Sequence, residues 1–239
     1  MNKNSNIYQI LYAAIMVVLV GAVLALVYMS LKPRQDENIA NDKRRQILAA
    51  VHIAPPTESE TGATFDKYVT GGMLVDSLGA VVDTTRKAAF EVDMSKNVKQ
   101  AQRQLPVFVC TLDDGSTKYV IPLYGAGLWG PIWGYAAVDD NGNTVYGTYF
   151  THSGETPGLG ARITEPEFQK QFDGKELHKE GAFKSIAVMK KGQKPLDGSD
   201  YVDAISGATI TSRGVGDMLE QCIKYYEPFL KQLSNRSNQ

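Results

Sequence analysis

The sequence predicts an α+β fold, in which an antiparallel-rich sheet with covering helices follows one N-terminal transmembrane helix. Three features carry this prediction. A long apolar stretch lies near the amino terminus, and pairs of strand-like runs joined by short polar turns occupy the middle. Apolar residues then recur at helical spacing near the carboxyl end. Strands grouped together and followed by helices are typical of the α+β class.

Residues 1–31 are expected to form a membrane anchor. Tyr8–Leu31 contains no charged residue, and Ile10–Met29 is apolar except for Gly21. Twenty helical residues span about 30 Å, the thickness of the hydrocarbon core of a bilayer. A cleaved signal peptide is the alternative, but its apolar core is shorter, about 7–15 residues, and small residues follow it. The Lys-Pro-Arg sequence at 32–34 favours an anchor that is retained.

Residues 32–72 are expected to hold a juxtamembrane helix and a connector. The helix is predicted over Asp36–Ile53, because the two prolines at 55–56 cannot continue it. The polar stretch Thr57–Asp66 reads as the connector, and residues 73–239 as the α+β domain.

Two hairpins form the centre of the predicted domain. A short strand at Ala88–Asp93 and a short helix at Met94–Gln104 are expected before them. The four hairpin strands are Val107–Thr111, Lys118–Tyr124, Ile132–Val138 and Thr144–Phe150. Within each pair the turn, Asp113–Ser116 or Asp139–Asn143, contains Asp-Gly or Asn-Gly, which favours a hairpin. Strands joined in this way must be antiparallel.

The rest of the domain is predicted to end in a long helix. A glycine-rich loop, a short helix and a further strand are expected first, at Thr151–Thr164, Glu165–Phe172 and Lys184–Met189. Apolar residues then recur at helical spacing over Ser212–Leu233. Pro228 should break or kink this helix near Tyr226.

The composition excludes several classes of site. A formal net charge of -1 gives no indication of the broad basic surface that nucleic-acid binding requires. Cys110 and Cys222 both lie in apolar stretches, and two buried free thiols are expected there. No CxxC pair exists and the three histidines are far apart in sequence, so no protein-held metal site is expected. Any redox centre must therefore be an organic cofactor or lie in a partner.

The segment Asp203–Ser212 carries the clearest chemical signal. It places several hydroxyl side chains and the small residues Gly207 and Ala208 just before an amphipathic helix. The start of a helix presents unpaired N–H groups and a partial positive charge, which suit a phosphate group. The alternative is an ordinary helix cap, in which Thr211 or Ser212 bonds those N–H groups.

The run Asp203-x-x-Ser206-Gly207-Ala208-Thr209 resembles the flavinylation sequence of FMN-binding subunits in bacterial sodium-pumping and ferredoxin-linked respiratory complexes. The resemblance implies that a flavin transferase joins FMN, through its phosphate, to Thr209. Thr61-Gly-Ala-Thr64 matches the same tetrad, but Glu58 stands in place of the aspartate and no helix start is expected after it. Thr64 is therefore expected to be unmodified.

Other residues gain a role through the same resemblance, which extends over most of the chain. A glycine-rich loop is expected to border the flavin with Glu155, Thr156, Leu159 and Gly160, although a simple Pro-Gly turn is the alternative. The stretch Gly125–Gly134 spells GxGxxG, but Pro131 and a strand-like run follow it, which argues against a dinucleotide fingerprint.

Three further residues are considered for the predicted site. Trp129, in the bend after the second hairpin strand, is expected to lie near the flavin or in the core, as is Trp133. Lys191 corresponds to a family lysine near the flavin, where a cation would stabilise the reduced ring. No acid–base pair and no metal ligand are expected.

The resemblance favours the family of the C subunits of sodium-translocating NADH:quinone oxidoreductases, with the G subunits of ferredoxin:NAD oxidoreductases (Rnf complexes) as the alternative. It implies electron transfer among membrane subunits and a domain on the periplasmic face of the bacterial inner membrane. The positive charges that follow the anchor favour the cytoplasmic side instead, but long domains can cross regardless. A non-redox scaffold module and a self-contained flavin reductase are the alternatives of another class.

Overall fold

The computed structural model describes residues 6–237 and divides the chain into two compact units, residues 1–43 and 44–239. The first described element, α1 (Asn6–Ala50), contains an 18-residue window of mean hydropathy 2.9, none of it buried within the chain. Its length and composition agree with the predicted membrane anchor. The predicted juxtamembrane helix is not a separate element, because α1 continues through Pro33.

The end of α1 belongs to the second unit. The helix stops at Ala50, earlier than the predicted Ile53, because His52 adopts a left-handed backbone with φ of 60°. The N–H of Ile53 then bonds back to the carbonyl of Leu48 at 3.0 Å, which closes the helix end.

The region predicted as a polar connector is partly helical. It contains η1 (Glu58–Glu60) and α2 (Thr61–Tyr68), and the sheet begins at Val69, before the predicted Met73. The strand predicted at Ala88–Asp93 is wrong, since α3 (Arg86–Glu91) is a helix that packs on a glycine of the sheet. The helix predicted at Met94–Gln104 shrinks to α4 (Met94–Asn97).

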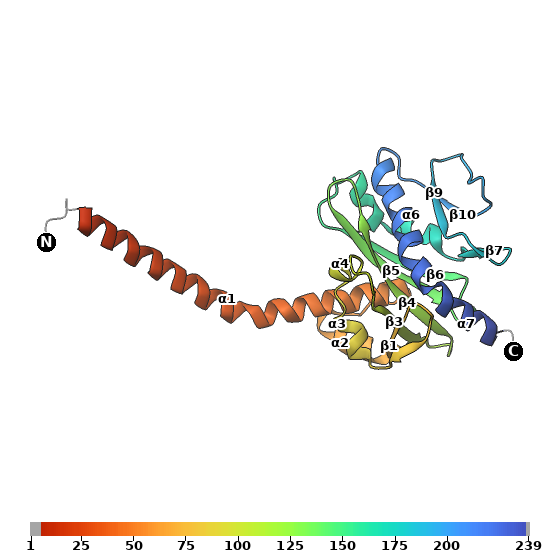
Figure 1. Cartoon of the computed structure of the whole chain (residues 1–239), viewed down its shortest axis with the longest axis horizontal. Helices are drawn as coiled ribbons and strands as arrows, with labels where there is room; N and C mark the ends of the chain where they lie inside the picture. Colours follow the sequence, from red (N-terminus) through yellow and green to blue (C-terminus); the bar gives the residue numbers. More distant parts are fainter. Residues whose placement is uncertain (1–5, 238–239) are drawn as a thin grey trace. The chain divides into compact units, whose positions relative to one another are not determined.

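A six-stranded antiparallel sheet forms the centre of the second unit, in the order β2-β1-β3-β4-β5-β6 (Figure 1). The strands are β1 (Val69–Val75), β2 (Val81–Asp83), β3 (Leu105–Thr111), β4 (Thr117–Ala126), β5 (Pro131–Asp139) and β6 (Val145–His152). Both predicted hairpins, β3–β4 and β5–β6, are confirmed. The strand β5 starts at Pro131, so no helix follows the GxGxxG stretch and the rejection of a dinucleotide fingerprint is confirmed.

The two faces of the sheet have separate cores. One face packs against the end of α1, with α2 and α3, through side chains such as Ile47, Leu48 and Phe65. The other is covered by α6 (Thr209–Ile223), η4 (Lys224–Tyr226) and α7 (Glu227–Ser237). The predicted break near Tyr226 is confirmed, since Pro228 lies in the first turn of α7. Cys110 and Cys222 are both buried and free, as predicted.

The remaining elements bring two distant loops together. They are η2 (Gly160–Thr164), α5 (Pro166–Gln169), η3 (Lys170–Phe172), β7 (His178–Lys179), β8 (Ala182–Phe183), β9 (Ile186–Met189) and β10 (Asp200–Asp203). The predicted helix at Glu165–Phe172 and the predicted strand at Lys184–Met189 are present in shorter form. Because β9 and β10 are parallel, the loops after Met189 and Asp203 leave the same end of this small sheet.

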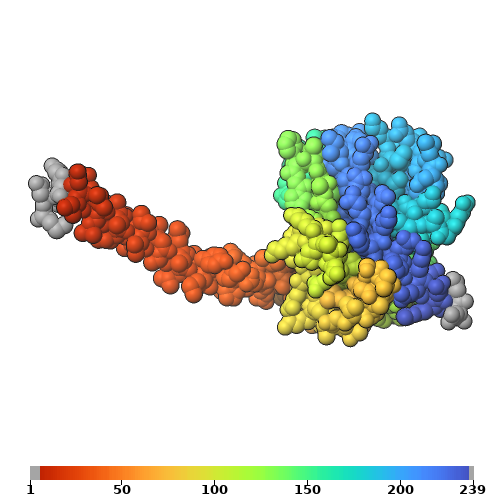
Figure 2. Space-filling view, in the orientation of Figure 1, coloured from red at the N-terminus to blue at the C-terminus, as the bar shows by residue number. Residues whose placement is uncertain are grey.

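The helix α6 joins the large and the small sheet. It packs against β4 on one side and against β9 on the other. Figure 2 shows α6 in blue, between the green end of the β4–β5 hairpin and the lighter blue region of β9 and β10. The start of this helix therefore lies where loops from both sheets can reach it.

Candidate functional site

The predicted phosphate loop connects β10 to α6. The chain leaves β10 at Asp203, turns at Ser206 and Gly207, and enters α6 at Thr209. Gly207 has φ of +79°, a left-handed conformation that other residues adopt only at a cost. The turn is held by a hydrogen bond from the N–H of Ala208 to the carbonyl of Ile205, at 3.0 Å.

Two hydroxyl groups at the start of α6 turn inward and do not cap the helix. The Ser212 hydroxyl accepts a hydrogen bond from the N–H of Ile205 at 3.0 Å. The Thr211 hydroxyl donates to Oε2 of Glu155 at 2.6 Å. The residue before the helix is Ala208, and no side chain of residues 6–237 bonds the first N–H groups. The ordinary-cap interpretation of Thr211 and Ser212 is therefore wrong.

Three backbone donors at this helix start have no acceptor within the described part of the chain. They are the N–H groups of Thr209, Ile210 and Thr211, whereas the N–H of Ser212 already bonds to the carbonyl of Ala208 at 2.9 Å. Thr209 is partly accessible, and Ser206 and Gly207 beside it are exposed. The arrangement offers unpaired donors and a threonine hydroxyl at the positive end of a helix dipole.

The predicted glycine-rich loop meets the phosphate loop through Glu155. This side chain is only 5% exposed. Its Oε1 accepts the N–H of Trp129 at 2.9 Å, while Oε2 accepts the Thr211 hydroxyl. Three segments that are far apart in sequence therefore converge on one carboxylate.

Four exposed apolar side chains lie on these same segments and form what we term the apolar rim. They are Leu128, Trp129, Leu159 and Ile210, with exposed fractions of 48%, 69%, 43% and 61%. Leu159 lies against the phosphate loop, since a Cβ built on Gly207 would be 3.0 Å from its Cδ2. Exposed apolar groups gathered in this way are typical of a surface that receives a ligand or a partner.

A cavity of about 380 Å³ adjoins the phosphate loop and is lined by Lys191, Ser206 and Asp203, among others. Lys191 reaches it from the loop after β9, whose last carbonyl, on Met189, accepts the N–H of Ala204 at 2.7 Å. The cavity also receives Arg162, which no feature of the sequence had singled out.

Most of the predicted site residues are thus brought together, with two differences. Thr156 is exposed in the glycine-rich loop, and its carbonyl accepts the N–H groups of Leu159 and Ala161 at 3.1 and 3.2 Å. Trp133 lies elsewhere, because its indole N–H donates to Gln46 at 3.3 Å, at the end of α1. The link between Glu155 and Thr211 was missed, since no local pattern connects residues so far apart.

The second tetrad, Thr61–Thr64, has a different environment. It forms the first turn of α2, and the N–H of Thr61 already bonds to the carbonyl of Glu58 in the preceding 3₁₀ turn. Thr61 itself is fully buried. The first N–H of this helix is therefore already bonded, unlike that of Thr209.

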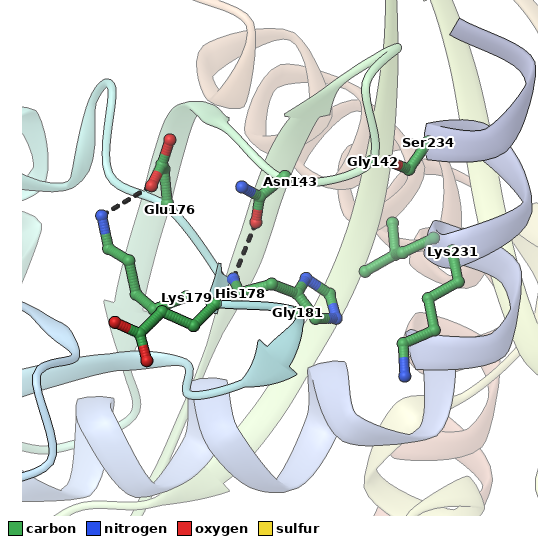
Figure 3. A pocket seen from close by; sticks show the side chains of 10 residues that line it. Gly142, Asn143, Glu176, His178, Lys179, Gly181, Lys231 and Ser234 are labelled. Carbon is green, nitrogen blue, oxygen red and sulfur yellow. Dashed lines mark hydrogen bonds and ion pairs between the residues drawn. The ribbon is translucent and has the colours of Figure 1, made fainter. Parts of the chain in front are cut away.

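A further pocket of about 400 Å³ lies between the β5–β6 turn, the β7–β8 hairpin and α7 (Figure 3). It contains none of the predicted site residues. The charged side chain of Lys179 is already engaged by Glu176 at 2.6 Å and by Asp200 at 3.1 Å, and the backbone N–H of His178 donates to Oδ1 of Asn143 at 2.7 Å. These contacts hold the β7–β8 hairpin in place, and we assign no ligand to the pocket.

Comparison with known proteins places this chain in a family. Residues 127–224 match the FMN-binding domain. The C subunit of the Na(+)-translocating NADH-quinone reductase of Vibrio anguillarum is 30% identical over 234 residues, which cover 90% of this chain and 89% of the relative. The protein of the same name from Pseudomonas aeruginosa is 29% identical over 238 residues, with 91% of each chain covered.

Solved structures agree with the sequence relatives. The structure of the corresponding C subunit from Parabacteroides distasonis is 44% identical, with a TM-score of 0.78. The match covers 84% of this chain and 96% of that one. Shewanella oneidensis NqrC is 30% identical, with a TM-score of 0.69 and 82% and 98% of the two chains covered.

Proposed function

Since the chain belongs to the family of the C subunits of Na(+)-translocating NADH-quinone reductases, it is an FMN-binding electron-transfer subunit of such a complex, and we propose that Thr209 carries the FMN covalently. The bond would be a phosphodiester between the threonine oxygen and the FMN phosphate. A flavin transferase would form this bond from a flavin dinucleotide (FAD): the Thr209 oxygen bonds to the flavin phosphate, the bond from that phosphate to the AMP part breaks, and AMP leaves with the hydroxyl proton released to solvent.

One observation carries the proposal. At the start of α6 the N–H groups of Thr209, Ile210 and Thr211 have no acceptor within residues 6–237, and Thr209 is the first residue of this helix and partly accessible. A phosphate held there accepts hydrogen bonds from a fixed backbone and gains from the helix dipole. The residues present therefore fit the phosphate end of FMN.

The surrounding residues are assigned supporting roles. Ser206, Gly207 and Ala208 keep the approach to Thr209 open, because their side chains are small and Gly207 has none. The apolar rim, with Gly160 behind it, limits the access of water to the flavin. The exposed Thr156 offers a hydroxyl to the polar edge of the ring, and Lys191 brings a positive charge that favours the reduced form. Bound FMN supplies electron uptake and release, which these side chains do not.

The complex of the named relatives is a Na(+)-translocating NADH-quinone reductase, so this chain works beside other membrane subunits of a multi-subunit assembly. The apolar half of α1 fits a single pass through the inner membrane. We place the α+β unit on the periplasmic side, where a covalent bond would retain the flavin.

The covalent bond is tested by expressing the full chain together with an active flavin transferase. We expect fluorescence of the denatured band under blue light and a mass increase of one FMN moiety on the peptide that contains Thr209. Thr209→Val should abolish both signals, whereas Thr64→Val, the matched change in the second tetrad, should leave them unchanged. A peptide that remains bare in the wild-type chain, or fluorescence that survives Thr209→Val, would contradict the proposal.

Copurification distinguishes the sodium-translocating complex from the ferredoxin-linked one. NADH-oxidising subunits should accompany the tagged chain from native membranes. Ferredoxin-linked subunits in their place would support the alternative complex, and a colourless chain made beside an active transferase would support a scaffold.

A further inference from the structure

Glu155 is a charged side chain buried inside the candidate site. It is 5% exposed, and no lysine, arginine or histidine forms an ion pair with it within the part of the chain that the structure describes. Burying a carboxylate in this way raises the free energy of the folded state unless hydrogen bonds replace those it made with water. Its two bonds, from the N–H of Trp129 and the hydroxyl of Thr211, provide that compensation.

Both carboxylate oxygens are committed to the protein. Oε1 and Oε2 each accept one of these bonds, and the backbone N–H of Glu155 donates to Nδ1 of His152 at 3.1 Å. The side chain therefore has a fixed position and little freedom to turn towards a ligand. This differs from the role that the family resemblance implies, in which Glu155 borders the flavin.

Two glycines make room for the carboxylate. A Cβ on Gly127 would overlap Oε1, and a Cβ on Gly160 would overlap Oε2. The Cβ on Gly160 would also lie 2.7 Å from the Thr211 hydroxyl. The backbone of both neighbouring loops thus approaches as closely as glycine permits, and the three segments fit together around one charged group.

The bond to Thr211 also decides how the start of α6 is used. A threonine in the first turn commonly serves as a local hydrogen-bonding group for nearby backbone. Here its hydroxyl donates to Glu155, and the N–H groups of Thr209, Ile210 and Thr211 have no acceptor among the described residues.

We propose that Glu155 is a positioning residue, which acts through Thr211 to hold the first turn of α6 so that Thr209 can receive FMN. The inference rests on the proposed attachment at Thr209. Glu155 does not contact the flavin in this view. It fixes Trp129 and Thr211 relative to the glycine-rich loop, and the loss of either hydrogen bond loosens the acceptor threonine.

The experiment measures the initial rate of flavin attachment to the full chain by the transferase, together with the midpoint of unfolding. Thr211→Val removes the hydroxyl and preserves the shape, and Thr211→Ser restores the hydroxyl. Glu155→Gln keeps an acceptor for Trp129 and an amide for Thr211, whereas Glu155→Leu removes both. Thr148→Val is the matched control, since Thr148 is 3% exposed and donates to the carbonyl of Gln169 at 3.1 Å, outside the site.

We expect Thr211→Val and Glu155→Leu each to slow attachment about tenfold or more, the effect of losing one buried hydrogen bond to a charged acceptor. Thr211→Ser and Glu155→Gln should stay within about threefold of the wild-type rate, since each preserves a hydrogen bond at this position. The double variant Glu155→Leu/Thr211→Val should be no slower than Glu155→Leu alone, because both changes break the same contact.

The results distinguish this inference from the attachment itself. If the wild-type chain never gains fluorescence, the proposed covalent attachment of FMN is contradicted. If the wild-type chain is labelled and Thr211→Val is labelled equally fast, only the positioning role of Glu155 is contradicted. The same holds if Thr148→Val slows attachment as much at an equal loss of stability, or if Glu155→Gln is as slow as Glu155→Leu. Because Thr211→Val removes a single hydroxyl, it provides an answer even where Glu155→Leu fails to fold.

Discussion

At the scale of single residues, His178 shows how burial links protonation to stability. It lies at the start of β7, and its ring packs edge-on against Phe183 with the centroids 5.5 Å apart and the planes at 68°. Burial lowers the pKa of His178 below its ordinary value of 6.5, although the nearby carboxylate of Glu227 raises it in part and Lys231 lowers it further. The folded chain therefore keeps this imidazole neutral where the unfolded chain protonates it.

The sign of the effect follows from that difference. Above pH 6.5 His178 is neutral in both states, and its contribution to stability is fully present. As the pH falls from 6.5 towards the lowered pKa, the unfolded state binds a proton that the folded state does not, so the free energy of unfolding decreases. One proton corresponds to at most about 1.4 kcal/mol per pH unit.

We therefore predict that His178→Gln loses less stability than the wild-type chain between about pH 7.5 and about pH 5.5, the range that brackets the ordinary histidine pKa. Urea unfolding at the two pH values measures the difference, and comparison of the two chains cancels the other titrating groups. Parallel stability curves for wild type and variant would show that His178 does not carry this part of the pH dependence.

At the scale of elements, α6 is held on β4 by a close approach of two backbones. A Cβ on Gly214 would overlap the carbonyl oxygen of Ala126, which is a fixed backbone atom. Gly216, one half-turn later, faces β9, and its Cβ would lie 3.2 Å from Cγ2 of Val188, a side-chain atom that can shift. The two glycines share one helix and differ in what lies opposite them.

We predict that Gly214→Ala destabilises the fold by about 1–3 kcal/mol, the usual cost of forcing extra volume into a packed contact. Gly216→Ala is the control and should be close to neutral, since alanine favours a helix over glycine by about 1 kcal/mol and offsets the tighter contact. Urea unfolding of both variants measures whether Gly214→Ala lowers the free energy of unfolding more than Gly216→Ala does. Equal destabilisation would mean that the approach of α6 to β4 is not the limiting contact.

Local sequence signals predicted those elements whose stability is local. The hairpins β3–β4 and β5–β6 follow from turns that contain Asp-Gly and Asn-Gly between strand-like runs. The helix α3 did not follow, because its residues Ala88–Glu91 resemble a short strand and become helical through packing on Gly72. A Cβ at that glycine would lie 2.7 Å from Cα of Arg86. The contact connects residues that no short pattern links.

The residues of the candidate site also fall into two groups: those that a local pattern predicts and those that only the folded chain brings together. Thr209 was predicted from a contiguous run that ends in Ser-Gly-Ala-Thr, and the structure starts α6 at that residue. The partnership of Glu155 and Thr211 spans 56 residues and depends on the bend at Trp129 as well. Sequence reasoning gave each residue a separate role because the carboxylate that joins them is defined only by the folded chain.

At the scale of the whole molecule, α1 serves two units of the chain. Its apolar part fits a membrane span, whereas its last residues belong to the core of the α+β unit. Ile47 and Leu48 are 0% exposed and Val51 is 1% exposed. Burial of each such side chain contributes about 1.5–3 kcal/mol. The boundary of the stable domain therefore lies within a continuous helix, where no change of secondary structure marks it.

Two truncations test this division. A chain that lacks residues 1–34 should leave the membrane, remain soluble and fold with its end of α1 in place. A chain that lacks residues 1–52 loses Ile47, Leu48 and Val51 together with the hydrogen bond from Trp133 to Gln46. At about 1.5–3 kcal/mol for each large apolar side chain, the loss approaches the whole stability of an ordinary domain. We expect the longer truncation to be largely unfolded in urea titrations and to aggregate without detergent. If both truncated chains unfolded at the same urea concentration, the end of α1 would contribute nothing to the core, and the domain would begin after it.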